Sequence, residues 1–163
     1  MSGREVIVIM GVSGTGKSSL GRTLGRDMKI PFLDADDFHP QENISKMESG
    51  HSLNDDDRFP WLDSIRLEMS KMESDKIVLA CSALKESYRL ALEDKSYKLN
   101  FIVLQASFET IFNRMENRNH FMPSKLLRSQ FDTLEIPEYG LHISTELKRS
   151  VLLKKIKTYL NRS

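Results

Sequence analysis

The sequence predicts an α/β fold in which helices cover both faces of a parallel sheet. Short apolar runs rich in β-branched residues alternate with longer amphipathic stretches along the 163 residues. These runs are apolar at nearly every position, which is typical of strands buried on both faces. The length and ordinary composition favour a single domain over residues 1–163.

The first half of the chain shows two strands and three helices. The run EVIVIM at 5–10 is followed by three glycines and the helical pattern 17–28. The run IPFLD at 30–34 predicts the second strand. Prolines favour the first turn of a helix, so the next two helices are expected at 40–49 and 60–72.

The second half continues the alternation. Apolar runs predict strands at 76–81 and 100–105 and, more weakly, at 141–144. Helical patterns lie between and after them, at 85–93, 108–117, 124–134 and 146–160. In the last of these, apolar residues recur at near-helical spacing, which indicates a terminal helix that packs on the core with a basic outer face.

Charge and composition exclude several classes of partner. The 24 Lys and Arg residues nearly balance the 23 Asp and Glu residues, so no basic field points to nucleic acid or an acidic membrane. A single cysteine, Cys81, excludes an internal disulfide and a multi-cysteine metal site. It fits a reducing compartment, and with no apolar run long enough for a signal peptide or a membrane span, we expect a cytoplasmic protein.

The glycine-rich turn carries the first functional motif. The stretch GVSGTGKS matches G-x-x-x-x-G-K-S/T, and it lies where that motif requires, after a strand and at the start of a helix. Its glycines allow successive backbone N–H groups to face a phosphate, and the helix N-terminus adds its dipole. Lys17 would bridge the β- and γ-phosphates, and the Ser18 hydroxyl would ligate Mg²⁺. The expected ATP-binding residues are Gly11, Ser13, Gly14, Thr15, Gly16, Lys17, Ser18 and Ser19.

A carboxylate for the metal is expected after the second strand. The apolar strand at 76–81 ends in Cys81 rather than in the Asp that often faces Mg²⁺ in such proteins. Asp34, Asp36 and Asp37 follow the second strand, beside the crevice at the carboxyl ends of parallel strands. An extended backbone would place Asp34 and Asp36 on one side and Asp37 on the other.

Two roles are open to this pair. We assign Asp34 to the metal, through water, and Asp36 to the proton of an acceptor hydroxyl, although the residues alone allow the reverse. Capping of the following helix is the alternative for any single Asp.

Three further blocks carry a family resemblance. They are DADDFHPQENISKMESGHSLNDDDRFPWL at 34–62, ACSALKESYR at 80–89 and HFMPSKLLRSQFDTLE at 120–135. With the glycine-rich turn they resemble gluconokinases of the small P-loop type, relatives of shikimate kinase, from Val6 to about Pro137. The resemblance implies ATP-dependent phosphorylation of D-gluconate to 6-phospho-D-gluconate. It also implies a P-loop three-layer sandwich with strand order 2-3-1-4-5, a helical lid and a homodimer.

Gluconate carries one carboxylate and several hydroxyls, so its site needs cations and hydrogen-bonding groups. Arg58, Lys85 and Arg89 lie in the resembling blocks and are candidates for binding the anion. Arg58 is the first choice because a planar guanidinium suits a carboxylate better than an ammonium does. His39 and Lys46 are candidates for the hydroxyls, although a histidine at a helix start and an exposed helical lysine explain them equally well.

The segment 113–134 reads as the lid, which would exclude water from the transferring phosphoryl group. Arg118 is the expected lid cation, and Arg114, one turn earlier, is the alternative. Here the chain departs from the family, because Asn119 precedes His120 where many relatives have glycine. This difference affects where the hinge of the lid is expected and which of the two arginines aligns with the lid arginine of the family.

Two other functions stay open at this point. One is a sibling kinase that phosphorylates shikimate or another small hydroxy acid, against which the 34–62 block argues. The other is a module that binds ATP without catalysis, against which the retained Lys17, Ser18, Asp34 and Asp36 argue. Cys81 and Trp61 are interpreted as packing residues.

Overall fold

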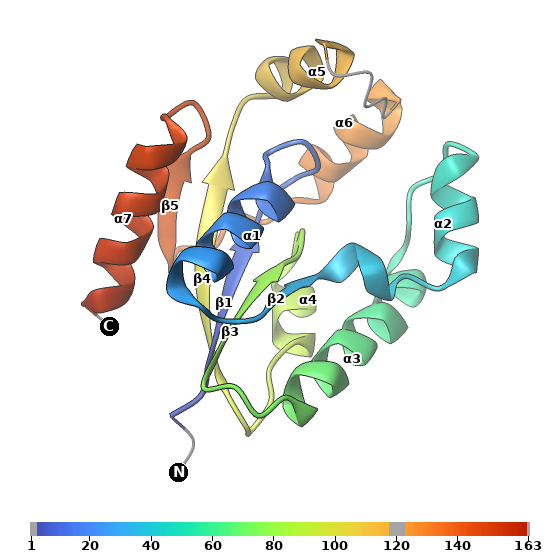
Figure 1. Cartoon of the computed structure of the whole chain (residues 1–163). Coiled ribbons are helices and arrows are strands. Elements are labelled where there is room, and N and C mark those ends of the chain that lie inside the picture. Colours follow the sequence, from blue (N-terminus) through green and yellow to red (C-terminus); the bar gives the residue numbers. More distant parts are fainter. Residues whose placement is uncertain (1–2, 118–122, 163) are drawn as a thin grey trace.

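A parallel sheet of five strands forms the centre of the computed structural model, which describes residues 3–117 and 123–162 (Figure 1). The strand order is β2-β3-β1-β4-β5, and every neighbouring pair is parallel. This confirms the fold class and the strand order expected from the sequence. The strands are β1 (Glu5–Met10), β2 (Phe32–Asp34), β3 (Lys76–Ala80), β4 (Lys98–Gln105) and β5 (Leu141–Ser144).

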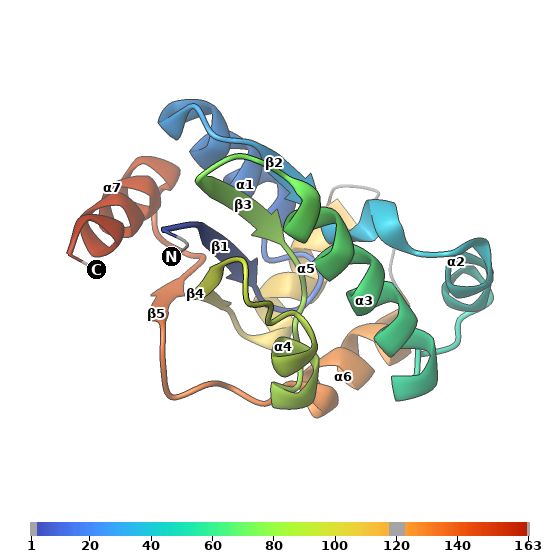
Figure 2. The ribbon, with the colours of Figure 1, turned by 90° about the horizontal axis from the view of Figure 1, so that it is seen from below.

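Helices form the two outer layers of the sandwich. Helices α1 and α7 cover one face of the sheet and α3 and α4 the other, while α5 and α6 lie at the carboxyl ends of the strands (Figures 1 and 2). None of the helices within residues 3–117 and 123–162 has the length and apolar character needed to cross a membrane. The helices are α1 (Lys17–Met28), α2 (Gln41–Glu48), α3 (Asp55–Lys71), α4 (Glu86–Ala91), α5 (Phe108–Asn117), α6 (Ser124–Thr133), α7 (Arg149–Asn161) and the short 3-10 helix η1 (Ala35–Phe38).

The central position of β1 in the sheet explains why its sequence is apolar throughout. Val6, Val8 and Met10 enter one core cluster together with side chains of α3, whereas Ile7 and Ile9 enter a second cluster with side chains of α1 and α7. All five side chains are fully buried. Since successive side chains of a strand point to opposite faces, a strand with a helix layer on each side needs apolar residues at every position.

Helix α3 begins five residues earlier than the proline at position 60 suggested. Asn54 and Asp57 form a capping box: the Asn54 side chain accepts from the Asp57 N–H, and the Asp57 carboxylate accepts from the Asn54 N–H, both at 2.8 Å. Three aspartates occupy the first turn, where their charges complement the helix dipole. As a result, Arg58 lies on the helix and not before it.

The backbone after β2 also differs from the expected extended form. Residues Ala35–Phe38 form the 3-10 helix η1, and the Asp34 side chain caps it by accepting from the Asp36 N–H at 3.0 Å. The extended backbone on which the placement of Asp34 and Asp36 on one side depended is therefore not present. The helical turn still keeps both carboxylates beside the glycine-rich loop, as the contacts below show.

Candidate active site

The loop between β1 and α1 has the backbone of a phosphate cradle. Gly14 and Gly16 have φ angles of 84° and 89°, in the left-handed region that favours glycine. At Gly14 space is limiting as well, because a Cβ would lie 2.7 Å from the side chains of Ile111 and Met115 on α5. The Ser13 N–H donates to Gln130 Oε1, whereas the N–H groups that follow it and the N-terminus of α1, which begins at Lys17, are available to an anion.

The side chains of Lys17 and Ser18, where this loop enters α1, both form hydrogen bonds at the site. Lys17 Nζ donates to the Val12 carbonyl at 3.0 Å. Burial lowers the pKa of Lys17, while the charges of Asp36 and Asp34 oppose that shift. Ser18 Oγ donates to Asp34 Oδ2 at 2.6 Å. A hydroxyl beside a carboxylate fits Mg²⁺, which kinases bind through one or two carboxylates together with substrate phosphates.

Asp36 lies between the loop and the rest of the site. Desolvation raises the pKa of Asp36, the charge of Asp34 raises it further, and Lys17 opposes both. Its side chain is 83% exposed, so an incoming hydroxyl can reach it. An exposed carboxylate that feels the charge of a lysine of the phosphate loop is suited to accept a proton from that hydroxyl.

A cation-lined cavity of about 400 Å³ lies at the start of α3 and α4. Arg58 donates to the Tyr88 hydroxyl at 3.0 Å, and that hydroxyl donates to Asp55 Oδ1 at 2.5 Å. Lys85 Nζ donates to the same oxygen of Asp55 at 3.1 Å. The structure thus brings together Arg58 and Lys85, two of the three cations expected to bind the substrate carboxylate. The lining residues are Leu53, Asn54, Asp55, Asp56, Arg58, Lys85, Tyr88 and Thr133.

His39 lies between Asp36 and the Trp61 side chain of α3. Its ring stacks on Trp61 with centroids 4.2 Å apart, and its Nε2 lies 4.0 Å from Asp36 Oδ1. Burial, with help from the charge of Arg58, lowers the pKa of His39 to about 4, so the ring is neutral at neutral pH. Trp61 is buried and donates to the Ala35 carbonyl at 2.7 Å, which confirms its interpretation as a packing residue.

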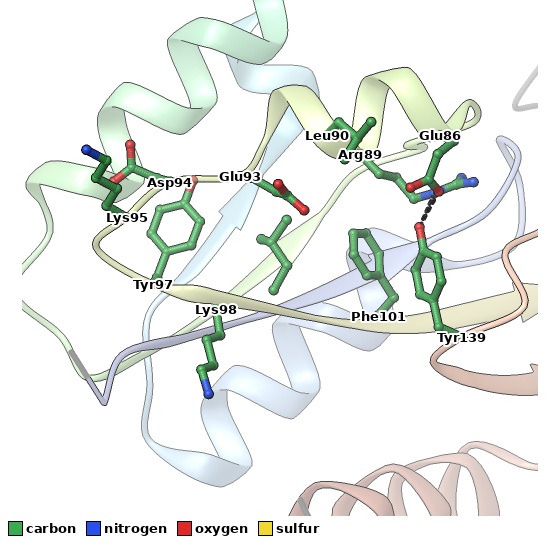
Figure 3. A pocket seen from close by; sticks show the side chains of 11 residues that line it. Glu86, Arg89, Leu90, Glu93, Asp94, Lys95, Tyr97, Lys98, Phe101 and Tyr139 are labelled. Carbon is green, nitrogen blue, oxygen red and sulfur yellow. Dashed lines mark hydrogen bonds and ion pairs between the residues drawn. The ribbon is translucent and has the colours of Figure 1, made fainter. Parts of the chain in front are cut away.

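Arg89 faces away from the cavity of Arg58. Its guanidinium donates to the carbonyls of Ala83 and Glu135, at 2.6 and 2.9 Å, and to the Tyr139 hydroxyl at 2.8 Å. Figure 3 shows Arg89 and Tyr139 at one end of a different cavity, of about 750 Å³, between α4 and β4. The structure therefore does not bring Arg89 together with Arg58 and Lys85. The Arg89 side chain instead joins the loop before α4 to the loop that follows α6.

Two of the remaining candidates, Lys46 and Arg114, have partners of their own. Lys46 pairs with Asp57 at 2.6 Å. Arg114 donates twice to Thr145, to its hydroxyl and its carbonyl, at 3.2 Å each. Arg118 lies outside the described residues, as do Asn119 and His120. Cys81 is buried, and burial raises the pKa of its thiol to about 12, in agreement with its interpretation as a packing residue.

Sequence reasoning missed four residues that the structure places at the site: Asp55, Tyr88, Gln130 and Thr133. Each lies in one of the blocks that carry the family resemblance. Asp55 is the first of three consecutive aspartates, and nothing in that run separates it from its neighbours. Gln130 accepts from the Ser13 N–H at 2.7 Å, a contact between residues 117 positions apart.

Known proteins resemble the chain over most of its length. The sequence profile of the shikimate kinase family matches residues 13–156. A gluconokinase of Arabidopsis thaliana is 39% identical, over 96% of this chain and 95% of that protein. The chain belongs to the gluconokinases. The thermosensitive gluconokinase of Escherichia coli is 40% identical, over 82% of this chain and 73% of its own length.

Solved structures agree with this assignment. The crystal structure of a gluconokinase from Sinorhizobium meliloti superposes with a TM-score of 0.88 at 38% identity, covering 99% of this chain and 94% of that one. A shikimate kinase from Aquifex aeolicus, at 17% identity and a TM-score of 0.56, shares the fold. As a member of the gluconokinase family, the chain is a phosphotransferase.

Proposed function

We propose that this chain phosphorylates D-gluconate with ATP and forms 6-phospho-D-gluconate. One observation carries the proposal: a series of polar contacts leads from the phosphate loop to the first turn of α3, next to Arg58. Ser18 donates to Asp34, which also accepts from the Asp36 N–H, and His39 lies 4.0 Å from Asp36. The Asn43 side chain then contacts both His39 and the Asp57 carbonyl. The donor and acceptor ends of a kinase site are thus adjacent.

The two ends of gluconate match the two ends of the site. Its carboxylate suits the cavity of Arg58 and Lys85, where Lys85 already donates to a carboxylate, that of Asp55. Its 6-hydroxyl lies at the opposite end of the carbon chain and would face Asp36. Neutral His39, between the two, offers a hydrogen-bonding nitrogen to the intervening hydroxyls.

The chain's own residues supply positioning and charge for an in-line transfer. Lys17 stabilises negative charge on the β- and γ-phosphates, and the N–H groups of the loop hold the same oxygens. Asp36 orients the 6-hydroxyl and takes its proton. Ser18 and Asp34 would hold Mg²⁺, directly or through water, and that ion supplies charge neutralisation between the phosphates.

Three finer expectations accompany this proposal. Residues 113–134, with Arg118 as the cation, would close over the phosphates and exclude water. The resemblance to gluconokinases favours a homodimer, and the single cysteine favours the cytoplasm. Each has its own direct measurement: hydrolysis of ATP without acceptor, mass in solution, and location in cells.

A coupled assay of ADP release tests the proposed function. Purified protein with ATP and Mg²⁺ is offered D-gluconate, other sugar acids, shikimate, nucleoside monophosphates, or no acceptor. We expect release with D-gluconate and a product phosphorylated at the 6-hydroxyl, identified by phosphorus NMR. Release with shikimate alone would assign the acceptor to the sibling kinase reaction. Binding of ATP without release on any acceptor would favour a module without catalysis.

A further inference from the structure

One peptide unit of the phosphate loop is held from both sides. The Val12 carbonyl accepts from Lys17 Nζ at 3.0 Å and from Thr15 Oγ1 at 2.9 Å. The N–H of the same unit belongs to Ser13, and it donates to Gln130 Oε1 at 2.7 Å. Because a trans peptide is planar, its C=O and N–H point in opposite directions. The contact with Gln130 therefore fixes the orientation of the carbonyl that holds Lys17.

Gln130 belongs to α6, which contacts the acceptor side as well. Ser129, the preceding residue, accepts from the Ser52 hydroxyl at 2.8 Å, in the connection between α2 and α3. Thr133, one turn later, lines the cavity of Arg58. A single helix thus reaches both the phosphate loop and the cavity proposed for gluconate.

We propose that Gln130 is a positioning residue for Lys17. Its side-chain oxygen holds the Ser13 N–H, so the Val12 carbonyl stays turned toward the ammonium group. Without that oxygen the peptide unit is held only on its carbonyl side, by Thr15 and Lys17, so the direction of the carbonyl toward the ammonium group is less fixed. Since α6 also lines the acceptor cavity, Gln130 sets the position of Lys17 relative to the acceptor. The kinetic part of this proposal rests on the proposed function, whereas the binding part does not.

A double-mutant cycle on nucleotide binding tests the proposal without any acceptor. The variants are Gln130→Leu, Lys17→Met and the double variant, and the probe is a non-hydrolysable ATP analogue with Mg²⁺, titrated by calorimetry. Asp132→Asn, an exposed position on the same helix, is the matched control. Thermal unfolding confirms that each variant is folded.

We expect Gln130→Leu to weaken binding of the analogue about tenfold when Lys17 is present and less than twofold when it is Met, because coupled residues are not additive. Equal weakening in both backgrounds would overturn the proposal, since Gln130 would then only support the fold of the loop. Unchanged binding in Gln130→Leu would overturn it as well.

Kinetics with D-gluconate add a second readout. We expect Gln130→Leu to lower kcat about tenfold with little change in KM for gluconate, because an interaction that acts in the transition state affects kcat. Gln130→Glu keeps the acceptor oxygen and is expected to restore most of the nucleotide affinity lost in Gln130→Leu. If the unmodified protein does not phosphorylate gluconate, the proposed function fails, and the binding cycle still decides the role of Gln130.

Discussion

The donor side of the site is made of backbone, and the acceptor side is made of side chains. The phosphate loop occupies one continuous stretch, 11–19, and its ligands are mainly N–H groups shaped by left-handed glycines. The acceptor cavity draws Arg58 from α3, Lys85 and Tyr88 from the start of α4, and Thr133 from the end of α6. The donor side is thus formed by one local sequence motif, whereas the acceptor side is formed by residues that come together only in the folded chain.

This difference determines how each side responds to substitution. On the donor side, the groups expected to bind phosphate are mainly backbone N–H groups, and the proposed chemistry depends on a few side chains such as Lys17 and Asp36. On the acceptor side, Arg58, Tyr88, Asp55 and Lys85 form one connected set of hydrogen bonds. We therefore expect substitution of Asp36, which lies between the two sides, to have a large effect on turnover by itself. Substitutions within the cavity should have smaller effects on catalysis that depend on one another.

The largest effect is expected for Asp36→Asn. Because Asn cannot take the proton of the acceptor hydroxyl, kcat with gluconate should fall about 10²- to 10⁴-fold. Affinity for ATP, which depends on the loop, should change less than about twofold. Steady-state kinetics and nucleotide titration measure both. Asp37→Asn makes the same charge change at the exposed neighbour and serves as control. Near-normal turnover of Asp36→Asn would remove Asp36 from this role.

The next effect concerns stability and pH at His39. In the unfolded chain His39 takes up a proton near the ordinary histidine pKa of 6.5, but the folded protein does so only near 4, where its pKa lies. Between these two pKa values the unfolded state thus binds more protons than the folded state. The contribution of His39 to the stability of the fold is therefore full above pH 6.5 and is lost as the pH falls toward 4. The loss amounts to about 3 kcal/mol in unfolding free energy.

The His39→Phe variant isolates this contribution, because phenylalanine keeps a ring against Trp61 and cannot titrate. Urea unfolding at several pH values between 7 and 4 should show the wild-type protein losing more stability than the variant. His142→Phe, at an exposed position of β5, is the control. If the wild-type protein and His39→Phe lose the same stability as the pH falls, His39 does not contribute to the pH dependence of stability.

The contrast between the two sides also explains what the sequence was able to predict. The glycine-rich turn and the strand order follow from contiguous patterns and from the family resemblance, whereas the hydrogen bond between Ser18 and Asp34, both assigned to the metal from the sequence, was found only in the structure. The 3-10 helix after β2 was not predicted, because the capping of its N–H by Asp34 competes with the extended form. The early start of α3 was missed because Pro60 was interpreted as the first turn of the helix, and Asn54 with Asp57 departs from the S/T-x-x-E/Q pattern by which a capping box is recognised.

Arg89 shows the limit of reasoning from a block of sequence. It lies four residues after Lys85 and in the same block, yet its guanidinium binds carbonyls of Ala83 and Glu135. Which arginine faces a cavity depends on the carbonyls that the folded chain places around it, and sequence spacing does not contain that information. For the same reason Tyr88 and Gln130 were found only in the structure.

A smaller loss is expected for Arg58→Lys, which keeps the charge and removes the planar guanidinium. An ammonium cannot form the two parallel hydrogen bonds that a guanidinium makes with a carboxylate, so kcat/KM for gluconate should fall about 10- to 100-fold, mainly through KM. KM for ATP should stay nearly constant. Arg66→Lys changes an arginine on the same helix that pairs with Asp63 and Asp94, and it is the control. A change in KM for ATP as large as that for gluconate would contradict the division into two sides.

The smallest effect is expected for Tyr88→Phe. The hydroxyl accepts from Arg58 and donates to Asp55, and the loss of such bonds should raise KM for gluconate about threefold to tenfold. Because these groups form one set, Tyr88→Phe should add little in an Asp55→Asn background, whereas it should be additive with Thr15→Val on the donor side. Kinetics of the single and double variants measure both effects. Strong coupling between Tyr88 and Thr15 would show that the loop and the cavity act as one network and that the two sides are not separable.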